Sequence, residues 1–228
     1  MPITLDTDLD PALYPLAWLL GTWRGTGAVQ LAGEQGESDG RAIEQELVAE
    51  DVGDGAMAWT MRTWVLDAPA PVPPTTAFAN APADDDDDAA EGTDASGDGT
   101  DAADDAEPQR RLLVAESGFW RVVGPVPGQD LEAAAAAKPG SPEAVVSYEL
   151  EATFASSQGT VEVCVGEVRG PRIQLATDTV GRSDGSAAAY SSSTRLFGLV
   201  GGRLMWLLER ATETSEMTPY LSLELDRA

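Results

Sequence analysis

The 228-residue chain contains no histidine, and this absence removes several kinds of chemistry at once. Without an imidazole there is no Ser-His-Asp or Cys-His catalytic arrangement, and zinc would have to be held by carboxylates and a single sulfur. Cysteine is almost absent as well, since Cys164 is the only one. A single cysteine cannot form an internal disulfide, which fits a reducing compartment.

Basic residues are also scarce, because 14 Lys and Arg stand against 39 Asp and Glu, for a formal net charge of -25. Nucleic-acid phosphates and anionic membrane surfaces repel such a chain, so neither is expected as a partner. The sequence shows no basic segment followed by an apolar core near its start, and no apolar run long enough to span a bilayer. We therefore expect a cytoplasmic protein.

Residues 67–108 differ in composition from the rest of the chain. They are rich in Pro, Ala and Gly, and they hold 13 of the 39 acidic residues and no Lys or Arg. Such a segment cannot bury enough apolar surface to offset its ordering entropy, so a long disordered acidic insertion is expected. Its aspartates at 84–88 lack the alternate spacing of a calcium loop. A second connection is expected over 124–143, with a short helix within 131–138, and residues 1–228 are interpreted as one domain interrupted at 67–108.

The remaining sequence has β-strand patterns, apart from its start. Asp10 and Pro11 form an N-cap and first-turn pair before leucines at helical spacing, so residues 10–20 are predicted to form a short helix. Ten strands with mostly short, Gly-containing connections favour an all-β, ten-stranded antiparallel up-and-down β-barrel, because closure removes exposed edges. Its interior could hold a small ligand. The predicted strands are residues 22–31, 41–51, 56–66, 111–123, 144–154, 160–168, 171–180, 187–198, 202–210 and 217–226.

The motif G-x-W-x-G-x-G opens the first predicted strand with Gly21, Trp23, Gly25 and Gly27. Residues at alternate positions share one face of a strand, where the glycines permit close approach by another backbone and Trp23 would cover the space they leave. That arrangement suits the closed end of a barrel, and an ordinary Gly-rich hairpin with one anchoring Trp is the alternative. A strand rather than a helix follows the motif, which excludes a dinucleotide fingerprint.

Residues 19–27, Leu-Leu-Gly-Thr-Trp-Arg-Gly-Thr-Gly, resemble the opening of the nitrobindin family, whose members form ten-stranded barrels similar to fatty-acid-binding proteins. Residues 61–64, 115–121 and 217–222 resemble, in order, the third, fourth and last strands of that family. The resemblance implies haem b, held by a histidine in the last strand, and isomerisation of peroxynitrite to nitrate at the ferric iron. In this chain Tyr220 stands where that histidine would be.

Because the axial ligand sets haem chemistry, the missing histidine predicts a barrel that has lost haem b binding and peroxynitrite isomerase activity. Such a barrel would have no cofactor and would bind another small apolar ligand or serve a role that the sequence does not identify. One alternative is a ferric haem protein with Tyr220 as phenolate ligand, which requires a nearby cation. Cys164 is interpreted as an inert packing residue, and Met205 and Met217 as at most weak ligands. A further alternative is an interaction protein whose acidic insertion binds a basic partner.

Two other hypotheses concern carboxylates and the last strand. Glu116 and Glu167 could act as acid or base in a cavity, although a solvent-facing position is the commoner outcome for each. Arg227 is expected to stack on Trp23 in a cation-π contact that closes the barrel floor, with a solvated C-terminus as the alternative. The sequence assigns no catalytic residue and no metal ligand.

Overall fold

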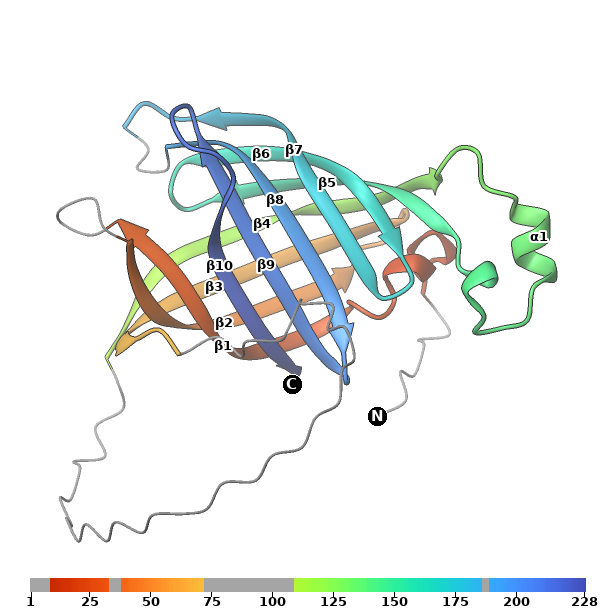
Figure 1. Ribbon diagram of the computed structural model, residues 1–228, viewed down its shortest axis with the longest axis horizontal. Helices are drawn as coiled ribbons and strands as arrows, with labels where there is room; N and C mark the ends of the chain where they lie inside the picture. Colours follow the sequence, from red (N-terminus) through yellow and green to blue (C-terminus); the bar gives the residue numbers. More distant parts are fainter. Residues whose placement is uncertain (1–8, 33–37, 72–108, 186–188) are drawn as a thin grey trace, which may run out of the picture.

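The computed structural model describes residues 9–32, 38–71, 109–185 and 189–228, which form a closed antiparallel β-barrel (Figure 1). Each strand pairs with its neighbours in sequence, and β1 pairs with β10 to close the ring. This architecture confirms the predicted ten-stranded up-and-down barrel. The strands are β1 (Gly21–Ala32), β2 (Ser38–Asp51), β3 (Ala56–Pro69), β4 (Arg110–Pro125), β5 (Ser147–Ser156), β6 (Thr160–Arg169), β7 (Arg172–Arg182), β8 (Tyr190–Val200), β9 (Arg203–Thr212) and β10 (Thr218–Arg227).

The helical segments are shorter than predicted. The short helix expected over 10–20 is present as the 3-10 helix η1 (Pro11–Leu16), which is shorter than predicted. Pro15 lies inside it and cannot donate the backbone hydrogen bond that an α-helix would need there. The predicted helix within 131–138 is α1 (Leu131–Ala136), which buries no residue. A second 3-10 turn, η2 (Pro142–Ala144), delays β5 to Ser147, three residues after the predicted start.

The acidic insertion lies almost entirely outside the described residues. Its predicted first residues, 67–69, belong instead to the end of β3. Residues 72–108, and with them the hypothesis of a basic partner, fall outside the part of the chain that the structure describes. Because β3 and β4 pair along most of their length, the insertion connects two adjacent strands of an intact barrel.

The two ends of the barrel differ, and we call them the floor and the mouth. The floor is the end where β1 begins and β10 ends, and the mouth is the opposite end. Figure 1 shows η1 and α1 at the same end of the barrel, and the fully buried side chains of Leu13, Leu16 and Leu19 join the barrel core there. Asp10 ties η1 to the turn between β2 and β3, because its carboxylate accepts a hydrogen bond from the backbone N–H of Gly55 at 3.0 Å.

Aromatic side chains fill much of the interior. Trp59 stacks on Trp120 with ring centroids 4.9 Å apart, and Phe197 stacks on Trp206 at 5.2 Å. Phe197 also contacts Trp59 and Trp120 edge to face, which joins the two stacks into one cluster. Aromatic pairs in these arrangements stabilise a core beyond the area they bury. Phe154 makes similar edge contacts with Trp59 and Trp120 and extends the cluster.

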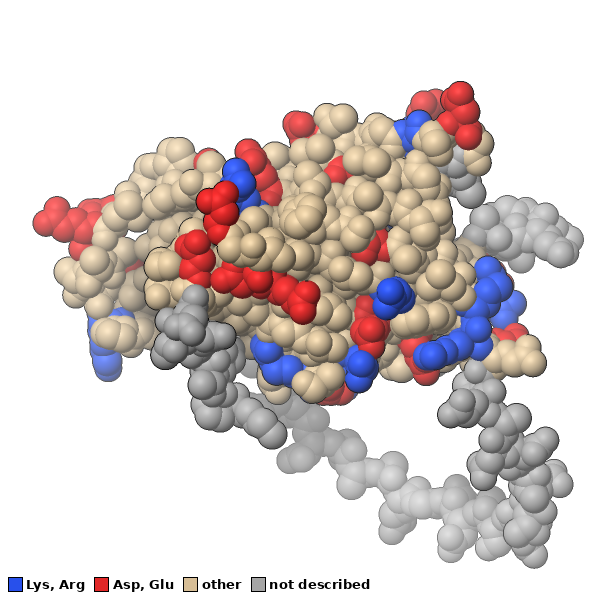
Figure 2. Space-filling model, turned by 180° about the vertical axis from the view of Figure 1, so that it is seen from behind, with Lys and Arg blue, Asp and Glu red and all other residues tan. Residues whose placement is uncertain are grey.

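The face of the barrel seen in Figure 2 carries side chains of both charges. Acidic and basic side chains lie among each other on this face, over the described residues. Trp64 faces outward on β3 and lies under Arg110, whose guanidinium carbon is 4.9 Å from the centroid of the Trp64 ring. Within the described ranges, no helix has the length and apolar character needed to cross a membrane.

Candidate functional site

The glycines of the motif allow β10 to approach β1 closely along the seam that closes the barrel. Gly25 pairs with Leu225 and Gly27 with Leu223. A Cβ on Gly25 would overlap the carbonyl oxygen of Glu224, and one on Gly27 would overlap the carbonyl oxygen of Ser222. These two positions therefore serve barrel closure.

Trp23 and Arg227 lie together at the floor. The Trp23 side chain is fully buried, and its indole nitrogen donates to the carbonyl oxygen of Leu19 at 2.8 Å. The guanidinium carbon of Arg227 lies 4.3 Å from the centroid of the Trp23 ring. Its Nη1 and Nη2 atoms donate to the carbonyl oxygens of Leu20 and Trp18 at 2.5 and 2.7 Å. Arg227 thus connects the end of β10 with the chain leading into β1, where Gly21 adopts a φ of 118° beneath it.

Tyr220 lies at an irregularity of β10 near the mouth. The pairing of β10 with β9 shifts register between Pro219 and Leu221, so Tyr220 is the extra residue of a β-bulge. In a regular strand, the side chain of Tyr220 would lie on the same face as those of Ser222 and Glu224. A β-bulge changes the direction of the side chain at the extra residue. Tyr220 is partly buried and packs against the edge of the hydrophobic core.

The guanidinium of Arg210 lies over two tyrosine rings at the mouth. Its guanidinium carbon lies 4.0 Å from the ring centroid of Tyr220 and 4.4 Å from that of Tyr190. Arg210 is in phase on β9 with the buried residues Trp206 and Leu208, which directs its side chain toward the barrel interior. We call these three residues the Tyr-Arg-Tyr stack. The sequence analysis did not identify Arg210 or Tyr190.

A buried ionic cluster occupies the interior between the mouth and the aromatic core. Arg195 is 1% exposed and binds Glu116 through two hydrogen bonds, of 2.6 and 3.1 Å, and Glu162 through one of 3.0 Å. Ser193 donates to the other oxygen of Glu162 at 2.5 Å, and Thr177 donates to that same oxygen. We call these five residues the Arg195 cluster. The solvent-facing position that the sequence favoured for Glu116 is wrong, because its side chain is only 5% exposed.

The pKa values within the cluster favour its charged form. Burial pushes the pKa of Glu162 upward, but the charge of Arg195 and the hydroxyl donors outweigh it, so the pKa lies below its ordinary value. Burial likewise opposes the charge on Arg195, yet Glu116 and Glu162 hold its pKa above the ordinary value. Both oxygens of Glu116 are engaged by Arg195, so this carboxylate is a structural ion-pair partner and not a free acid or base.

The other candidate residues from the sequence do not gather at one site. Cys164 is fully buried, and burial together with the charge of Glu162 raises its thiol pKa to about 12, which fits an inert packing residue. Glu167 is exposed on β6, as expected. Met205 faces away from the buried side of β9, and Met217 is exposed before β10.

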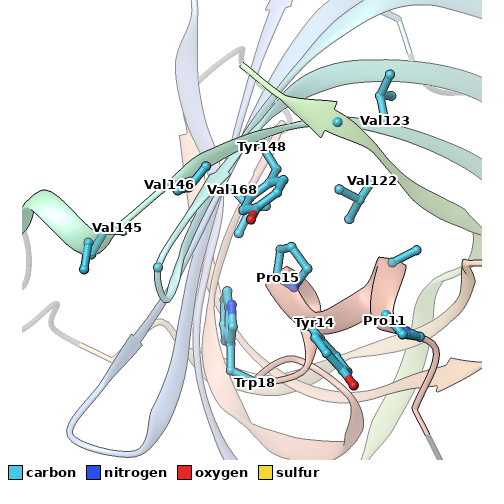
Figure 3. A pocket seen from close by; sticks show the side chains of 14 residues that line it. Pro11, Tyr14, Pro15, Trp18, Val122, Val123, Val145, Val146, Tyr148 and Val168 are labelled. Carbon is cyan, nitrogen blue, oxygen red and sulfur yellow. The ribbon is translucent and has the colours of Figure 1, made fainter. Parts of the chain in front are cut away.

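An apolar pocket lies at the floor, beside η1. Its volume is about 610 Å³, and none of its lining residues is charged. Figure 3 shows Pro15 and Trp18 on one side of this space and Val122 and Tyr148 on the other. The indole nitrogen of Trp18 is buried and has no hydrogen-bond partner among the described residues. A cavity of this volume and lining suits a small apolar molecule.

Comparison with a solved structure supports the fold. The crystal structure of Rv2717c from M. tuberculosis superposes with a TM-score of 0.56 over 97% of this chain and 99% of that one, at 22% sequence identity. The likeness extends over the whole barrel.

Comparisons with known sequences identify the family. The family model of the THAP4-like, heme-binding beta-barrel domain matches residues 12–227. A ferric nitrobindin-like protein of Beutenbergia cavernae is 35% identical, with 100% of this chain and 99% of the relative covered. A peroxynitrite isomerase of Kocuria rhizophila is 29% identical, with 100% and 96% covered. The chain therefore belongs to the nitrobindin family of THAP4-like haem-binding β-barrel domains.

Proposed function

We propose that this protein is a nitrobindin-family barrel that does not hold haem and that binds a small apolar molecule instead. The observation that carries the proposal is the Tyr-Arg-Tyr stack. At the position that the family resemblance assigns to the haem-ligating histidine, the chain has Tyr220, and one face of its ring is covered by Arg210. The whole sequence offers no imidazole as a substitute. These residues do not fit the histidine-ligated haem of the family.

The apolar molecule is assigned to the pocket at the floor. This pocket has the volume of a small-molecule site, and the valines and aromatic rings that line it offer apolar contacts without a charge to desolvate. Tyr14 and Val123 are more than half exposed at this end of the barrel, so part of the lining is open to an incoming molecule. Burying these side chains against a ligand would contribute about 25 cal/mol for each Å² of apolar surface.

The haem part of the proposal is tested by titrating purified full-length protein with ferric haem and recording the Soret band. We expect no stoichiometric shift in the wild type, because no strong axial ligand is free at Tyr220. Tyr220→Phe, which removes only the hydroxyl, is then expected to behave like the wild type. A stoichiometric Soret shift in the wild type that Tyr220→Phe abolishes would overturn this part of the proposal.

That outcome would support a second candidate function, a ferric haem protein that acts on peroxynitrite with Tyr220 as axial ligand. One observation favours it: the guanidinium of Arg210 lies 4.0 Å from the Tyr220 ring. A phenolate ligand requires a nearby cation to stabilise its charge, and Arg210 would supply one. The name of the relative from Kocuria rhizophila, peroxynitrite isomerase, fits this activity.

The ligand part is tested with N-phenyl-1-naphthylamine, an uncharged apolar dye whose fluorescence rises on burial. Val123→Asp places a charge at the edge of the pocket, and we expect at least about a tenfold loss of dye affinity, since burying an unpaired carboxylate costs well over 1.4 kcal/mol. Val200→Asp is the matched control, because Val200 is similarly exposed and does not line the pocket. Equal affinities of the two variants would contradict the assignment.

A further inference from the structure

Arg210 differs in its environment from Arg195 and Arg203, the two arginines that each bind two carboxylates. Arg195 has two carboxylate partners, and so does Arg203, which lies on the same strand as Arg210 and bonds Glu224 and Asp226. Among the described residues, no carboxylate forms an ion pair with Arg210, and its Nε atom is buried without a hydrogen-bond partner. In a chain of net charge -25, an inward-facing guanidinium without a carboxylate is unusual.

The two tyrosine rings fix how this guanidinium presents its donors. Tyr190 and Tyr220 stack on the guanidinium, at 4.4 and 4.0 Å from its carbon. A guanidinium carries its N–H groups in its own plane, so rings that lie against its faces leave the donors at its edge available to a ligand. Holding the side chain in this position before a ligand arrives lowers the entropy that binding would cost.

We propose that the Tyr-Arg-Tyr stack is a binding site for a carboxylate carried by a small apolar molecule. The planar edge of Arg210 matches the two oxygens of a carboxylate, which it would bind through two parallel N–H···O bonds. The tyrosine rings would contact the apolar part of the molecule beside it. This site lies at the mouth, at the opposite end of the barrel from the pocket beside η1, and it does not depend on that pocket.

The surrounding charge selects a singly charged ligand over a dianion such as phosphate. Arg210 contributes one positive charge, and Glu162 lies close behind the stack, with the Tyr190 hydroxyl 3.4 Å from one of its oxygens. Burial and the charge of Glu162 raise the pKa of Tyr190, so this tyrosine stays neutral and adds no repulsion of its own. Glu162 and Glu116 share the single cation of Arg195, so a second negative charge on the ligand would face a net negative charge behind the stack.

The experiment is isothermal titration calorimetry of the full-length protein at low ionic strength, with octanoate as the probe. Octanol keeps the chain and lacks the carboxylate, and inorganic phosphate supplies a different anion. We expect octanoate to bind at least about tenfold more tightly than phosphate, and its binding to require Arg210, because a paired carboxylate forms charge-assisted hydrogen bonds. Octanol that binds in the pocket at the floor should not depend on Arg210. Equal binding of phosphate, or an equal effect of Arg210→Met on octanol and octanoate binding, would overturn the proposal.

Variants locate the site. Arg210→Met is expected to weaken octanoate binding at least about tenfold, whereas Arg203→Met, the same change on the same strand, is expected to leave it unaltered. Unchanged octanoate affinity in Arg210→Met would refute the site. Circular dichroism checks the fold of each variant. If Arg210→Met does not fold, Arg210→Lys serves instead: it keeps the charge but loses the planar fork, so full wild-type affinity there would refute bidentate binding.

Discussion

The Arg195 cluster predicts a large and pH-dependent loss of stability when Arg195 is replaced by methionine. Arg195, Glu116 and Glu162 are 1%, 5% and 1% exposed. Removing the cation leaves two carboxylates in the barrel interior without their partner. Breaking a buried ion pair in this way costs about 3–5 kcal/mol. The cost is the desolvation of the remaining charges, so it should depend on whether they are ionised.

The sign of the pH dependence follows from the pKa of Glu162, which lies below its ordinary value in the wild type. Its contribution to stability is present above the unfolded-state pKa of about 4.3 and is lost as the pH falls through the lower folded-state value. In Arg195→Met, the charge of Arg195 no longer outweighs the effect of burial, so the folded-state pKa of Glu162 should rise above 4.3. The variant should then lose stability as the pH rises. The difference between its free energy of unfolding and that of the wild type should therefore grow between pH 5 and pH 8.

Urea unfolding of both proteins at pH 5 and pH 8 measures this difference. Arg203→Met is the matched control, because Arg203 bonds two carboxylates in an exposed setting where ion pairs contribute little. Adding Glu116→Gln and Glu162→Gln to Arg195→Met should recover much of the stability, since the amides carry no charge to desolvate. The reasoning would be refuted if Arg195→Met lost no more stability than Arg203→Met, or if the loss of stability in Arg195→Met did not change with pH.

Three further predictions concern the seam, the floor and the thiol. Gly27→Ala should destabilise the barrel by about 1–3 kcal/mol in urea unfolding, because its Cβ would overlap β10, whereas Gly124→Ala, with open space around it, should have little effect. A double-mutant cycle of Arg227→Ala and Trp23→Phe should give a coupling of about 0.5–2 kcal/mol, and a value near zero would argue against the stacking. Cys164, with its pKa raised to about 12, should resist dithionitrobenzoate at pH 8 until the protein unfolds, and rapid labelling of the folded protein would contradict its burial.

The barrel could be predicted from the sequence because the inward-facing residues keep their alternation across most strands. Leu221, Leu223 and Leu225 are all buried, as a period of two requires. Turn-forming glycines then mark where consecutive strands meet. The strand ends were less predictable, as at β5, where a proline turn takes up residues that continue the alternating pattern.

The buried charges could not be predicted, because a charged residue in a strand is ordinarily assigned to solvent. The sequence nevertheless contained a signal. Arg195 is two residues from Phe197, and Arg210 is two residues from Leu208, so each arginine lies on the same face of its strand as an inward-facing residue. What the sequence cannot supply is the partner. Glu116 lies 79 residues from Arg195 along the chain, and only barrel closure brings their side chains to 2.6 Å.

The contacts that close the barrel and the residues of the proposed mouth site lie on different parts of β10. From Ser222 to Arg227, β10 is held by the close approach at Gly25 and Gly27 and by the contact of Arg227 with Trp23. Tyr220 lies beyond these contacts, on a bulge whose side chain packs against Arg210. A change of residue at 220 therefore leaves the seam and the floor intact. The G-x-W-x-G-x-G motif accordingly predicts the barrel, whereas in our proposal the residues at 220 and 210 determine what the mouth can bind.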